Sequence, residues 1–236
     1  MNSRHFLGAY WPSRRESIVE CADRLAKFLS ALADCDPDLA TWYEQGGSRK
    51  GASALKASIE DNDYLLNLLN RGRSKRDVGR DVIEELGFRV GLWNGVNGDR
   101  EATLSITCGI YWDGPNPNAG LSNSVVLQLP KSLGALSEAK NMARVLTVVA
   151  EAWEPTWAGV LSRAAMRARH FNPALPFVDW MAYVPSEIDQ VPSPSTVLRL
   201  AGLGSIVVVQ TTPPSTDNPD ELTRIRRIDE ILRELR

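Results

Sequence analysis

The sequence predicts an α+β fold in which helices pack over a mainly antiparallel sheet. Apolar residues recur at helical spacing in the first third of the chain, alternate with polar residues in the middle, and follow both patterns in the remainder. Consecutive predicted strands lie a few residues apart, which is too close for the crossovers that parallel strands require. No Ser/Gly-rich linker separates two cores, so we expect residues 1–236 to form a single domain.

The first third of the chain is predicted to be rich in helices. It opens with an aromatic strand at residues 6–11, and Ser13 and Glu16 then have the spacing of a capping box at a helix start. The helix that follows has one apolar stripe, made of Ile18, Cys21, Ala22, Leu25, Phe28, Leu29 and Leu32. Further helices are expected after Asp36-Pro37, around residues 63–69, and through residues 82–86, where Gly87 ends the last of them.

The middle of the chain is predicted to form a three-strand meander between about residues 88 and 130. Its strands are expected at residues 88–92, 101–111 and 124–129. In the second strand, apolar side chains face one way, whereas Thr103, Ser105, Thr107 and Tyr111 face the other. This alternation is typical of a strand with one buried and one solvated face.

The remainder mixes helices and strands. A helix is expected at residues 135–153, strands at residues 157–161 and 180–184, and a hairpin at residues 196–200 and 205–210. Asn218-Pro219 then begins a last helix.

Composition and charge exclude several classes of protein. With 43% apolar and 24% charged residues, the chain is not disordered, and a formal charge of −2 argues against a strongly basic nucleic-acid or anionic-membrane binder. The three cysteines, Cys21, Cys35 and Cys108, match no metal or redox spacing, so we expect free thiols. We see no secretory signal or apolar run long enough to span a bilayer, and we therefore expect a cytoplasmic protein without membrane association.

No catalytic motif is present in the sequence. His5 and His170 are far apart in the chain and lie in no zinc-binding spacing, and no nucleophile elbow, P-loop or dinucleotide fingerprint appears. We therefore expect no metal, no cofactor and no enzymatic activity. The clustered carboxylates Asp34, Asp36 and Asp38 lie near a helix start, where N-capping explains them.

A basic run provides the main alternative function. Arg71, Arg73, Lys75 and Arg76 could contact phosphates and make the chain a nucleic-acid-binding module. The run also lies between two predicted helices, where cations favour the end of the first helix, and nearby aspartates dilute its charge. We consider direct binding of nucleic acid the less favoured reading.

Seven tryptophans are many for a chain of this length. Trp42, Trp153, Trp157 and Trp180 fit apolar stripes and are expected in the core. Trp11, Trp93 and Trp112 fall at strand ends beside polar residues. These three either cap the rim of the sheet or form a protein-binding surface, where aromatic residues and arginine supply most of the binding energy.

The sequence resembles the immunity protein 52 family over most of its length, most strongly between residues 6 and 130. The resemblance lies in an ordered series of motifs, at residues 6–11, 14–17, 20–22, 36–37, 42–43, 71–73, 83–88, 91–95, 105–111 and 123–127. It implies a bacterial antitoxin of a polymorphic toxin system, often one with type VI secretion. The partner implied is a nuclease toxin of the restriction-endonuclease type, Tox-REase class five, and homo-oligomers remain open.

An antitoxin of this kind acts by tight binding, so we expect its anchors on three aromatic loops. These are the loops at residues 11–15, 93–97 and 111–118. The predicted contact residues are Trp11, Arg14, Arg15, Trp93, Asn94, Asn97, Tyr111, Trp112, Asp113 and Asn116, with Asp34, Asp36 and Asp38 as a possible acidic patch. The overall charge argues against gross mimicry of DNA, and steric blocking or sequestration of the toxin remain alternatives.

Overall fold

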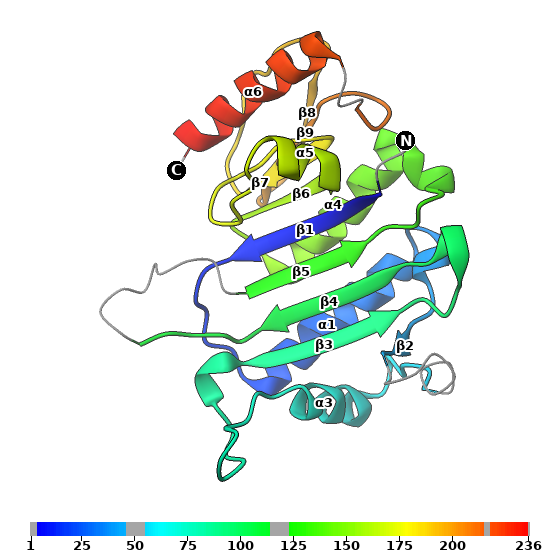
Figure 1. Ribbon diagram of the computed structural model, residues 1–236, viewed down its shortest axis with the longest axis vertical. Helices are drawn as coiled ribbons and strands as arrows, with labels where there is room; N and C mark the ends of the chain where they lie inside the picture. Colours follow the sequence, from blue (N-terminus) through cyan, green and yellow to red (C-terminus); the bar gives the residue numbers. More distant parts are fainter. Residues whose placement is uncertain (1–3, 46–54, 114–122, 215–217, 236) are drawn as a thin grey trace.

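The computed structural model describes residues 4–45, 55–113, 123–214 and 218–235 (Figure 1). One nine-stranded sheet has the order β2-β3-β4-β5-β1-β6-β7-β9-β8, and its neighbouring strands are antiparallel. The strands are β1 (His5–Trp11), β2 (Tyr43–Glu44), β3 (Phe88–Trp93), β4 (Thr103–Cys108), β5 (Asn123–Gln128), β6 (Trp157–Ser162), β7 (Met181–Val184), β8 (Thr196–Leu200) and β9 (Gly204–Val208). The predicted α+β class is confirmed.

Helices cover the two faces of this sheet unequally. The described helices are α1 (Ile18–Ala33), α3 (Asn62–Arg71), α4 (Ala139–Trp153), α5 (Arg163–Ala168) and α6 (Pro219–Glu234), with 3-10 turns η1 (Pro37–Leu39), η2 (Glu84–Leu86), η3 (Gly98–Arg100) and η4 (Gly134–Ser137). Helices α1, α3 and α4 pack on one face, whereas α5 and α6 lie on the other face over β6, β7 and β9 (Figure 1). No described helix covers β3, β4 and β5 on that second face.

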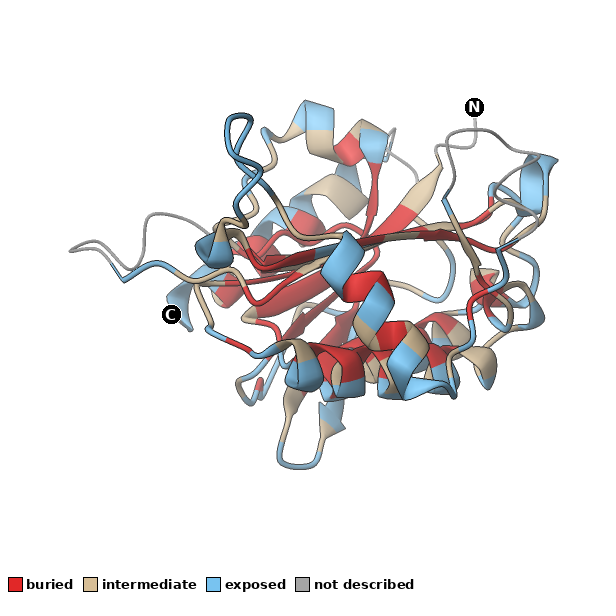
Figure 2. Ribbon diagram, turned by 90° about the horizontal axis from the view of Figure 1, so that it is seen from below, coloured by how far each residue is buried: buried red, intermediate tan, exposed pale blue. Residues whose placement is uncertain are grey.

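Two hydrophobic cores lie on the two sides of the sheet. The larger core fills the space between the sheet and α1, α3 and α4, and the smaller one lies under α5 and α6. Figure 2 shows the buried residues concentrated in the sheet and on the helix sides that face it. The central strand β1 contributes to both cores, with Leu7, Ala9 and Trp11 on one side and Phe6 and Tyr10 on the other.

The predicted meander is confirmed, and its register defines which residues share a face. β4 pairs with β3 and with β5, so that Val90, Ile106 and Val125 lie in one row on the buried side. The later elements also occupy the predicted segments, with two exceptions: η4 precedes α4 where one continuous helix was expected, and α5 was not predicted. Trp42, Trp153, Trp157 and Trp180 lie in the core as predicted, each at most 1% exposed.

The capping box of α1 lies one turn later than predicted. The Ser17 hydroxyl accepts a hydrogen bond from the Glu20 amide (3.2 Å), and the Glu20 carboxylate accepts one from the Ser17 amide (2.7 Å). The prediction of Ser13 and Glu16 was wrong because the Glu16 carboxylate is buried between two arginines. The predicted apolar stripe of α1 is confirmed.

The helix predicted through residues 82–86 is also wrong. Residues 73–83 form a narrow ribbon with a bridge between Lys75 and Val82, and only the short turn η2 follows it. Gly79 (φ 83°) and Arg80 (φ 60°) make the tight turn of the ribbon, which interrupts helical hydrogen bonding. Gly87 does adopt a positive φ, 54°, and a Cβ there would lie 2.2 Å from the Cys108 carbonyl oxygen. Only glycine fits at this close approach.

The three cysteines are free thiols that differ in exposure to solvent. Cys21 and Cys108 are buried, whereas Cys35 is partly exposed. A hydrogen bond with Cys21 and burial raise the pKa of the Cys108 thiol, and burial raises the pKa of Cys35.

Because the thiolate is the reactive form, a disulfide reagent at pH 8 should label only Cys35 in the native protein, and slowly. All three thiols should react in denaturant, and rapid labelling of native Cys35→Ser protein would contradict this packing.

Candidate partner-binding surface

The loops that follow β1 and β4 meet at one end of the sheet. The Arg14 amide donates a hydrogen bond to the Ile110 carbonyl oxygen (2.9 Å). The Trp112 amide donates one to the Ser13 hydroxyl (2.7 Å). Two of the three aromatic loops predicted to bind a partner are therefore joined, and we call residues 12–15 and 110–113 the loop end.

A buried asparagine at the start of β5 holds the loop end together. The Asn123 side-chain amide donates hydrogen bonds to the carbonyl oxygens of Pro12 (2.9 Å) and Ile110 (3.0 Å). Its oxygen accepts a bond from the Ile110 amide (2.9 Å). The side chain thus satisfies backbone groups of both loops, because buried polar groups without partners would be costly.

The loop end exposes a large aromatic side chain beside a stacked cation. Trp112 is 56% exposed, and the Arg15 guanidinium carbon lies 4.6 Å from the centroid of the Tyr111 ring. Asp113 is also exposed, and a hollow of about 590 Å³ beside the loops is lined in part by Arg15 and Tyr111. Exposed aromatic and arginine side chains in one cluster are typical of protein-binding surfaces. Asn116 lies outside the described residues.

Trp11 and Arg14, which were predicted as contact residues, have structural roles. Trp11 is only 1% exposed and stacks on Trp153 with a centroid separation of 5.6 Å. The Arg14 guanidinium lies over the Trp11 ring, 5.2 Å from its centroid. A strand alternates its side chains between two faces, and this alternation turns Trp11 toward the core under α4.

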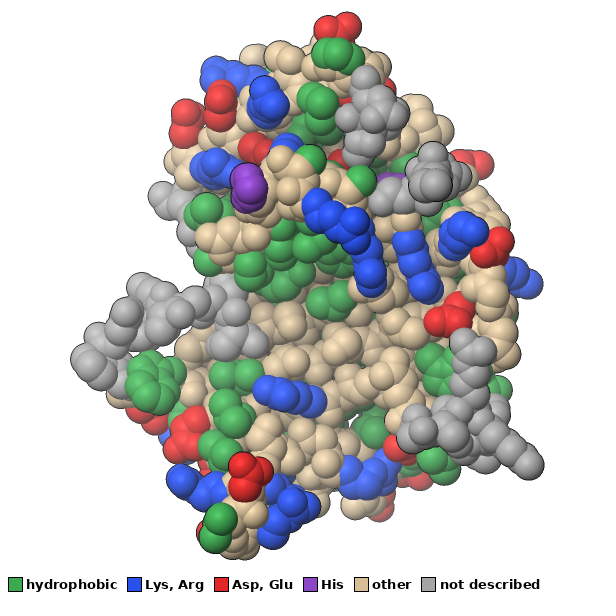
Figure 3. Space-filling model, viewed as in Figure 1, with side chains coloured by type: hydrophobic (Ala, Val, Ile, Leu, Met, Phe, Trp, Pro, Cys, Tyr) green, Lys and Arg blue, Asp and Glu red, His purple; other side chains and the backbone are tan. Residues whose placement is uncertain are grey.

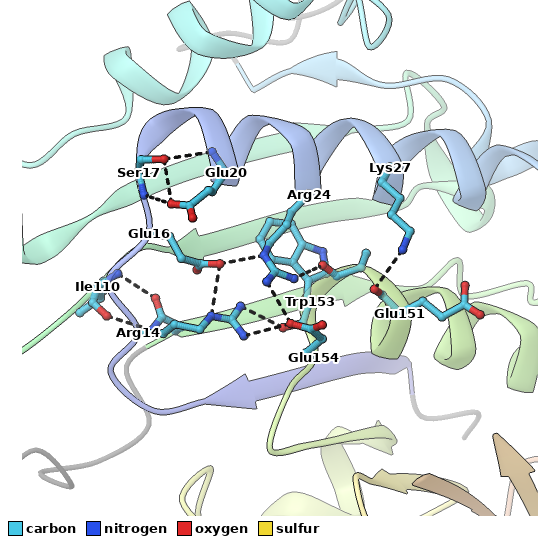
Figure 4. A network of polar contacts seen from close by, with 12 residues as sticks. Arg14, Glu16, Ser17, Glu20, Arg24, Lys27, Ile110, Glu151, Trp153 and Glu154 are labelled. Carbon is cyan, nitrogen blue, oxygen red and sulfur yellow. Dashed lines mark hydrogen bonds and ion pairs between the residues drawn. The ribbon is translucent and has the colours of Figure 1, made fainter. Parts of the chain in front are cut away.

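Arg14 belongs to a network of charges between α1 and the end of α4 (Figure 4). The nearly buried Glu16 carboxylate lies 3.2 Å from Arg14 Nε and 2.8 Å from Arg24 Nε. Arg24 also pairs with Glu154 at 2.9 Å. Each cation thus has a carboxylate partner, which offsets the cost of removing these charges from water.

The same side chains satisfy the last carbonyl groups of α4. Arg14 Nη2 donates to the Trp153 oxygen (2.9 Å), and Arg24 Nη1 donates to the Ala152 oxygen (2.8 Å). Lys27 Nζ reaches the Glu151 oxygen at 3.3 Å. The last turn of a helix leaves carbonyl groups unpaired and carries a partial negative charge, so three cations stabilise this end.

The third predicted loop, residues 93–97, follows the end of β3 that is far from the loop end. Trp93 is 9% exposed, and the Asn94 side chain is buried, where it bonds to the backbone of Asp38, Arg100 and Ala102. Asn97 is exposed. Five residue steps of about 3.3 Å separate Phe88 from Trp93, so this loop is about 17 Å from the loop end along the strand. The described residues of the three loops therefore form no single surface.

The three aspartates predicted as a possible acidic patch have separate structural partners. Asp36 caps η1 by accepting a hydrogen bond from the Asp38 amide (2.9 Å). The Asp38 carboxylate is paired with Arg100, with one Nε–Oδ2 distance of 3.0 Å. Asp34 is exposed, and its carbonyl oxygen accepts a bond from Arg144. Nearby arginines therefore reduce the negative charge of this region.

The basic run is likewise partly neutralised. Arg71 pairs with Glu44 at 2.7 Å, and Arg73 pairs with Glu84. Lys75 and Arg76 are exposed on the ribbon of residues 73–83. Two of the four cations proposed to contact phosphates thus already have carboxylate partners.

A second buried polar cluster lies under α5 and α6. Asp229 pairs with Arg169 (2.7 Å) and accepts a hydrogen bond from the Val178 amide (2.8 Å), while Asp179 accepts one from the Ser162 amide (2.7 Å). Burial raises the pKa of Asp179 and of Asp229, and burial lowers the pKa of His5. These carboxylates hold backbone groups in place, and the Ser162 hydroxyl caps α5.

The described part of the chain offers no candidate metal site and no candidate membrane span. No group of three or more His, Cys, Asp or Glu side chains in the described ranges is placed to hold a metal ion. Among these residues, no helix has the length and apolarity needed to cross a bilayer.

Comparison with known protein families identifies the family of this chain. The sequence model described as "Immunity protein 52" matches residues 3–235. The chain belongs to the immunity protein 52 family. No curated protein matches significantly.

A solved structure shares the fold of this family member. The Pseudomonas aeruginosa T6SS protein PA0821 is similar with a TM-score of 0.58 and 12% sequence identity. The match covers 99% of this chain and 73% of the other. At this identity the likeness shows the fold alone.

The charge network behind the loop end leads to a stability test. Glu16→Gln removes the carboxylate that lies between Arg14 and Arg24, so it should lower the free energy of unfolding by about 2 kcal/mol. Glu230→Gln, which alters an exposed ion pair with Arg227, should change it by less than about 0.5 kcal/mol. Urea denaturation of both variants measures the difference, and equal effects would contradict a structural role for Glu16.

Proposed function

We propose that this chain is an antitoxin that neutralises one cognate toxin by tight stoichiometric binding. The toxin proposed is a secreted nuclease of the restriction-endonuclease type, in Tox-REase class five. The match of the family model to residues 3–235 carries this proposal. The nuclease class itself rests on the resemblance of the sequence motifs to that family.

The loop end supports a role in protein binding. It presents the exposed Trp112 beside the Arg15–Tyr111 stack, on a backbone held by the buried Asn123. A rigid aromatic anchor contributes a large contact area and loses little conformational entropy on binding. Arg15, Tyr111, Trp112 and Asp113 are therefore the contact residues that we retain from the sequence prediction.

Neutralisation of a nuclease requires tight binding. Free nuclease would damage the host, so we expect a dissociation constant of about 1 nM or lower, equivalent to about −12 kcal/mol. Interfaces of this kind bury about 800 Å² on each partner. The loop end alone offers too few side chains for this area, so the partner must also cover neighbouring surface.

The charge distribution argues against mimicry of DNA as the mode of inhibition. The chain has a formal charge of −2, and Asp36 and Asp38 are engaged in capping and in the Arg100 pair. A protein that mimics DNA needs dense negative charge to match a basic groove. Steric blocking or sequestration of the toxin agrees better with these contacts.

We further propose that the protein acts in the cytoplasm, where a nuclease delivered by a type VI secretion apparatus would attack DNA. The free thiols Cys21, Cys35 and Cys108 agree with a reducing compartment. The delivery route rests on the family resemblance.

The nucleic-acid-binding reading remains the second candidate function. The exposed Lys75 and Arg76 favour it, whereas the ion pairs of Arg71 and Arg73 weaken it. A gel-shift assay with duplex DNA and RNA at low salt separates the two readings. Retention that Lys75→Ala/Arg76→Ala abolishes would favour the nucleic-acid module.

Co-expression tests the proposed function directly. The toxin domain encoded beside this gene should arrest growth alone, and the wild-type chain should restore growth and co-purify with it. Trp112→Ala should weaken binding at least ten-fold by calorimetry, because it removes the exposed anchor. Leu198→Ala, which truncates a 42% exposed side chain on the edge strand β8, is the matched control and should bind normally.

Three results would contradict this account. Failure of the wild-type chain to rescue growth would overturn the antitoxin assignment. Normal binding by a folded Trp112→Ala variant would remove the loop end from the interface. Turnover of a substrate by the isolated chain would contradict a purely binding role.

A further inference from the structure

No described helix covers β3, β4 and β5 on the face opposite α1 and α3. Register places the side chains of this face in three rows that cross the strands. The rows are Arg89, Thr107 and Ser124, then Gly91, Ser105 and Val126, then Trp93, Thr103 and Gln128. We call these nine residues the open face, and Figure 3 shows it below the lobe formed by α5 and α6.

The open face has an unusual composition for a solvated surface. Apart from Arg89 none of its nine residues is charged, and Ser, Thr and Gln make up most of the rest. Solvated faces of antiparallel sheets are ordinarily polar, but interface cores are depleted of charge. Serine and threonine lose less rotamer entropy than lysine or glutamate when a partner covers them.

Cations without partners border this neutral face. Arg89 is exposed and makes no ion pair or side-chain hydrogen bond with any described residue. The same holds for Arg163 and Arg167, the two exposed arginines of α5. Figure 3 shows Lys and Arg side chains along the border between the α5 lobe and the open face.

Several other described arginines, in contrast, have carboxylate partners. Arg24, Arg71 and Arg169, for example, each lie within 2.9 Å of a carboxylate oxygen. An arginine without a carboxylate beside a charge-poor surface is free to form a bidentate pair with a carboxylate of another molecule.

We propose that the toxin docks on the open face and presents carboxylates to Arg89, Arg163 and Arg167. This inference rests on the proposed antitoxin function and names the surface and the charge of the partner that it requires. The neutral rows form the centre of the interface, and the three arginines give it charge complementarity.

The open face alone is smaller than a complete interface. Adjacent strands lie about 4.8 Å apart, so β3 to β5 spans about 10 Å, and six residues along a strand extend about 17 Å. This area is less than half of the ~800 Å² that each side of a stable complex buries. The loop end adjoins the row of Arg89 at the end of β4, and α5 lies beyond β1, on the side of the open face next to β5. A partner that also covers the loop end and α5 would bury a larger area.

A protein partner agrees with these features better than a nucleic acid does. Nucleic-acid binding needs several cations along a backbone track, and single strands also need exposed aromatic rings for stacking. The open face holds one arginine among nine residues, and Trp93 on it is only 9% exposed. Neutral hydroxyl rows with a few cations suit a folded surface that carries scattered carboxylates.

Charge reversal tests the proposal with the complete chain and the toxin domain encoded beside its gene. Arg89→Glu should weaken binding at least ten-fold, and Arg163→Glu/Arg167→Glu should do so as well, because carboxylates would then oppose carboxylates. Lys140→Glu makes the same charge change on α4, which covers the other face of the sheet, and should bind normally. Wild-type affinity should also fall with added salt, and Arg89→Glu should reduce that dependence.

A neutral variant tests the face without changing its charge. Ser105→Trp places a bulky ring in the middle row and should weaken binding at least ten-fold, whereas Ser30→Trp on the exposed side of α1 should not. Both positions are exposed, so the fold should tolerate both changes, and thermal unfolding of each variant checks this. Normal binding by folded Arg89→Glu and Ser105→Trp proteins would overturn the docking proposal.

Three outcomes distinguish docking of the toxin on the open face from the alternative explanations. If wild-type protein rescues growth but the open-face variants also bind normally, the antitoxin function stands and this docking site falls. Retention of a DNA or RNA duplex that Arg89→Glu abolishes would make the face a nucleic-acid site instead. A mass by light scattering that shifts from dimer to monomer in Ser105→Trp would make it a contact between copies of this chain, and either result would overturn the proposal.

Discussion

The position of β1 at the centre of the sheet is the constraint on which the rest of the structure depends. β1 pairs with β5 on one side and with β6 on the other, so the first strand of the chain joins the meander to the later strands. Its side chains also belong to both cores, with Leu7 and Trp11 under α4 and Phe6 and Tyr10 on the opposite side. Burial in the smaller core raises the pKa of Tyr10 to about 12, as expected for a phenol removed from water. Beyond β1 the second layer of helices stops, and this boundary creates the open face.

Much of the fold could be predicted from local patterns, because most elements bury one periodic stripe. The stripe of α1, the alternation in β4 and the breaks at Gly72 and Pro155 each act over a few residues, and the structure follows them. The errors arose where long-range contacts override local chemistry. Glu16 forms no cap because Arg14 and Arg24 surround it, and the segment before Gly87 forms a ribbon and not a helix. Helix α5 was missed because six residues carry too little periodicity to detect.

The candidate site was predictable only in part, because exposure depends on which face of an element meets the core. Trp11 and Trp112 both lie at strand ends among polar residues, yet one is 1% and the other 56% exposed. Trp11 follows the alternation of β1 into the core, whereas Trp112 lies beyond the end of β4. The polar alternation of Thr103, Ser105 and Thr107 did indicate a solvated face. Sequence alone could not show that helices leave it uncovered, because that depends on where α5 and α6 pack.

The charge of the open face also bears on how a nuclease would be inhibited. A mimic of DNA must present carboxylates to the cationic groove of the enzyme, whereas this face presents arginines in a neutral surround. The docking that we propose would therefore place an acidic region of the toxin on this face, and not a groove that binds phosphates. Nucleases hold their catalytic metal ions with carboxylates, which are acidic groups that lie beside that groove. An antitoxin that pairs arginines with such carboxylates would compete with the metal and block the groove at the same time, without imitating the substrate.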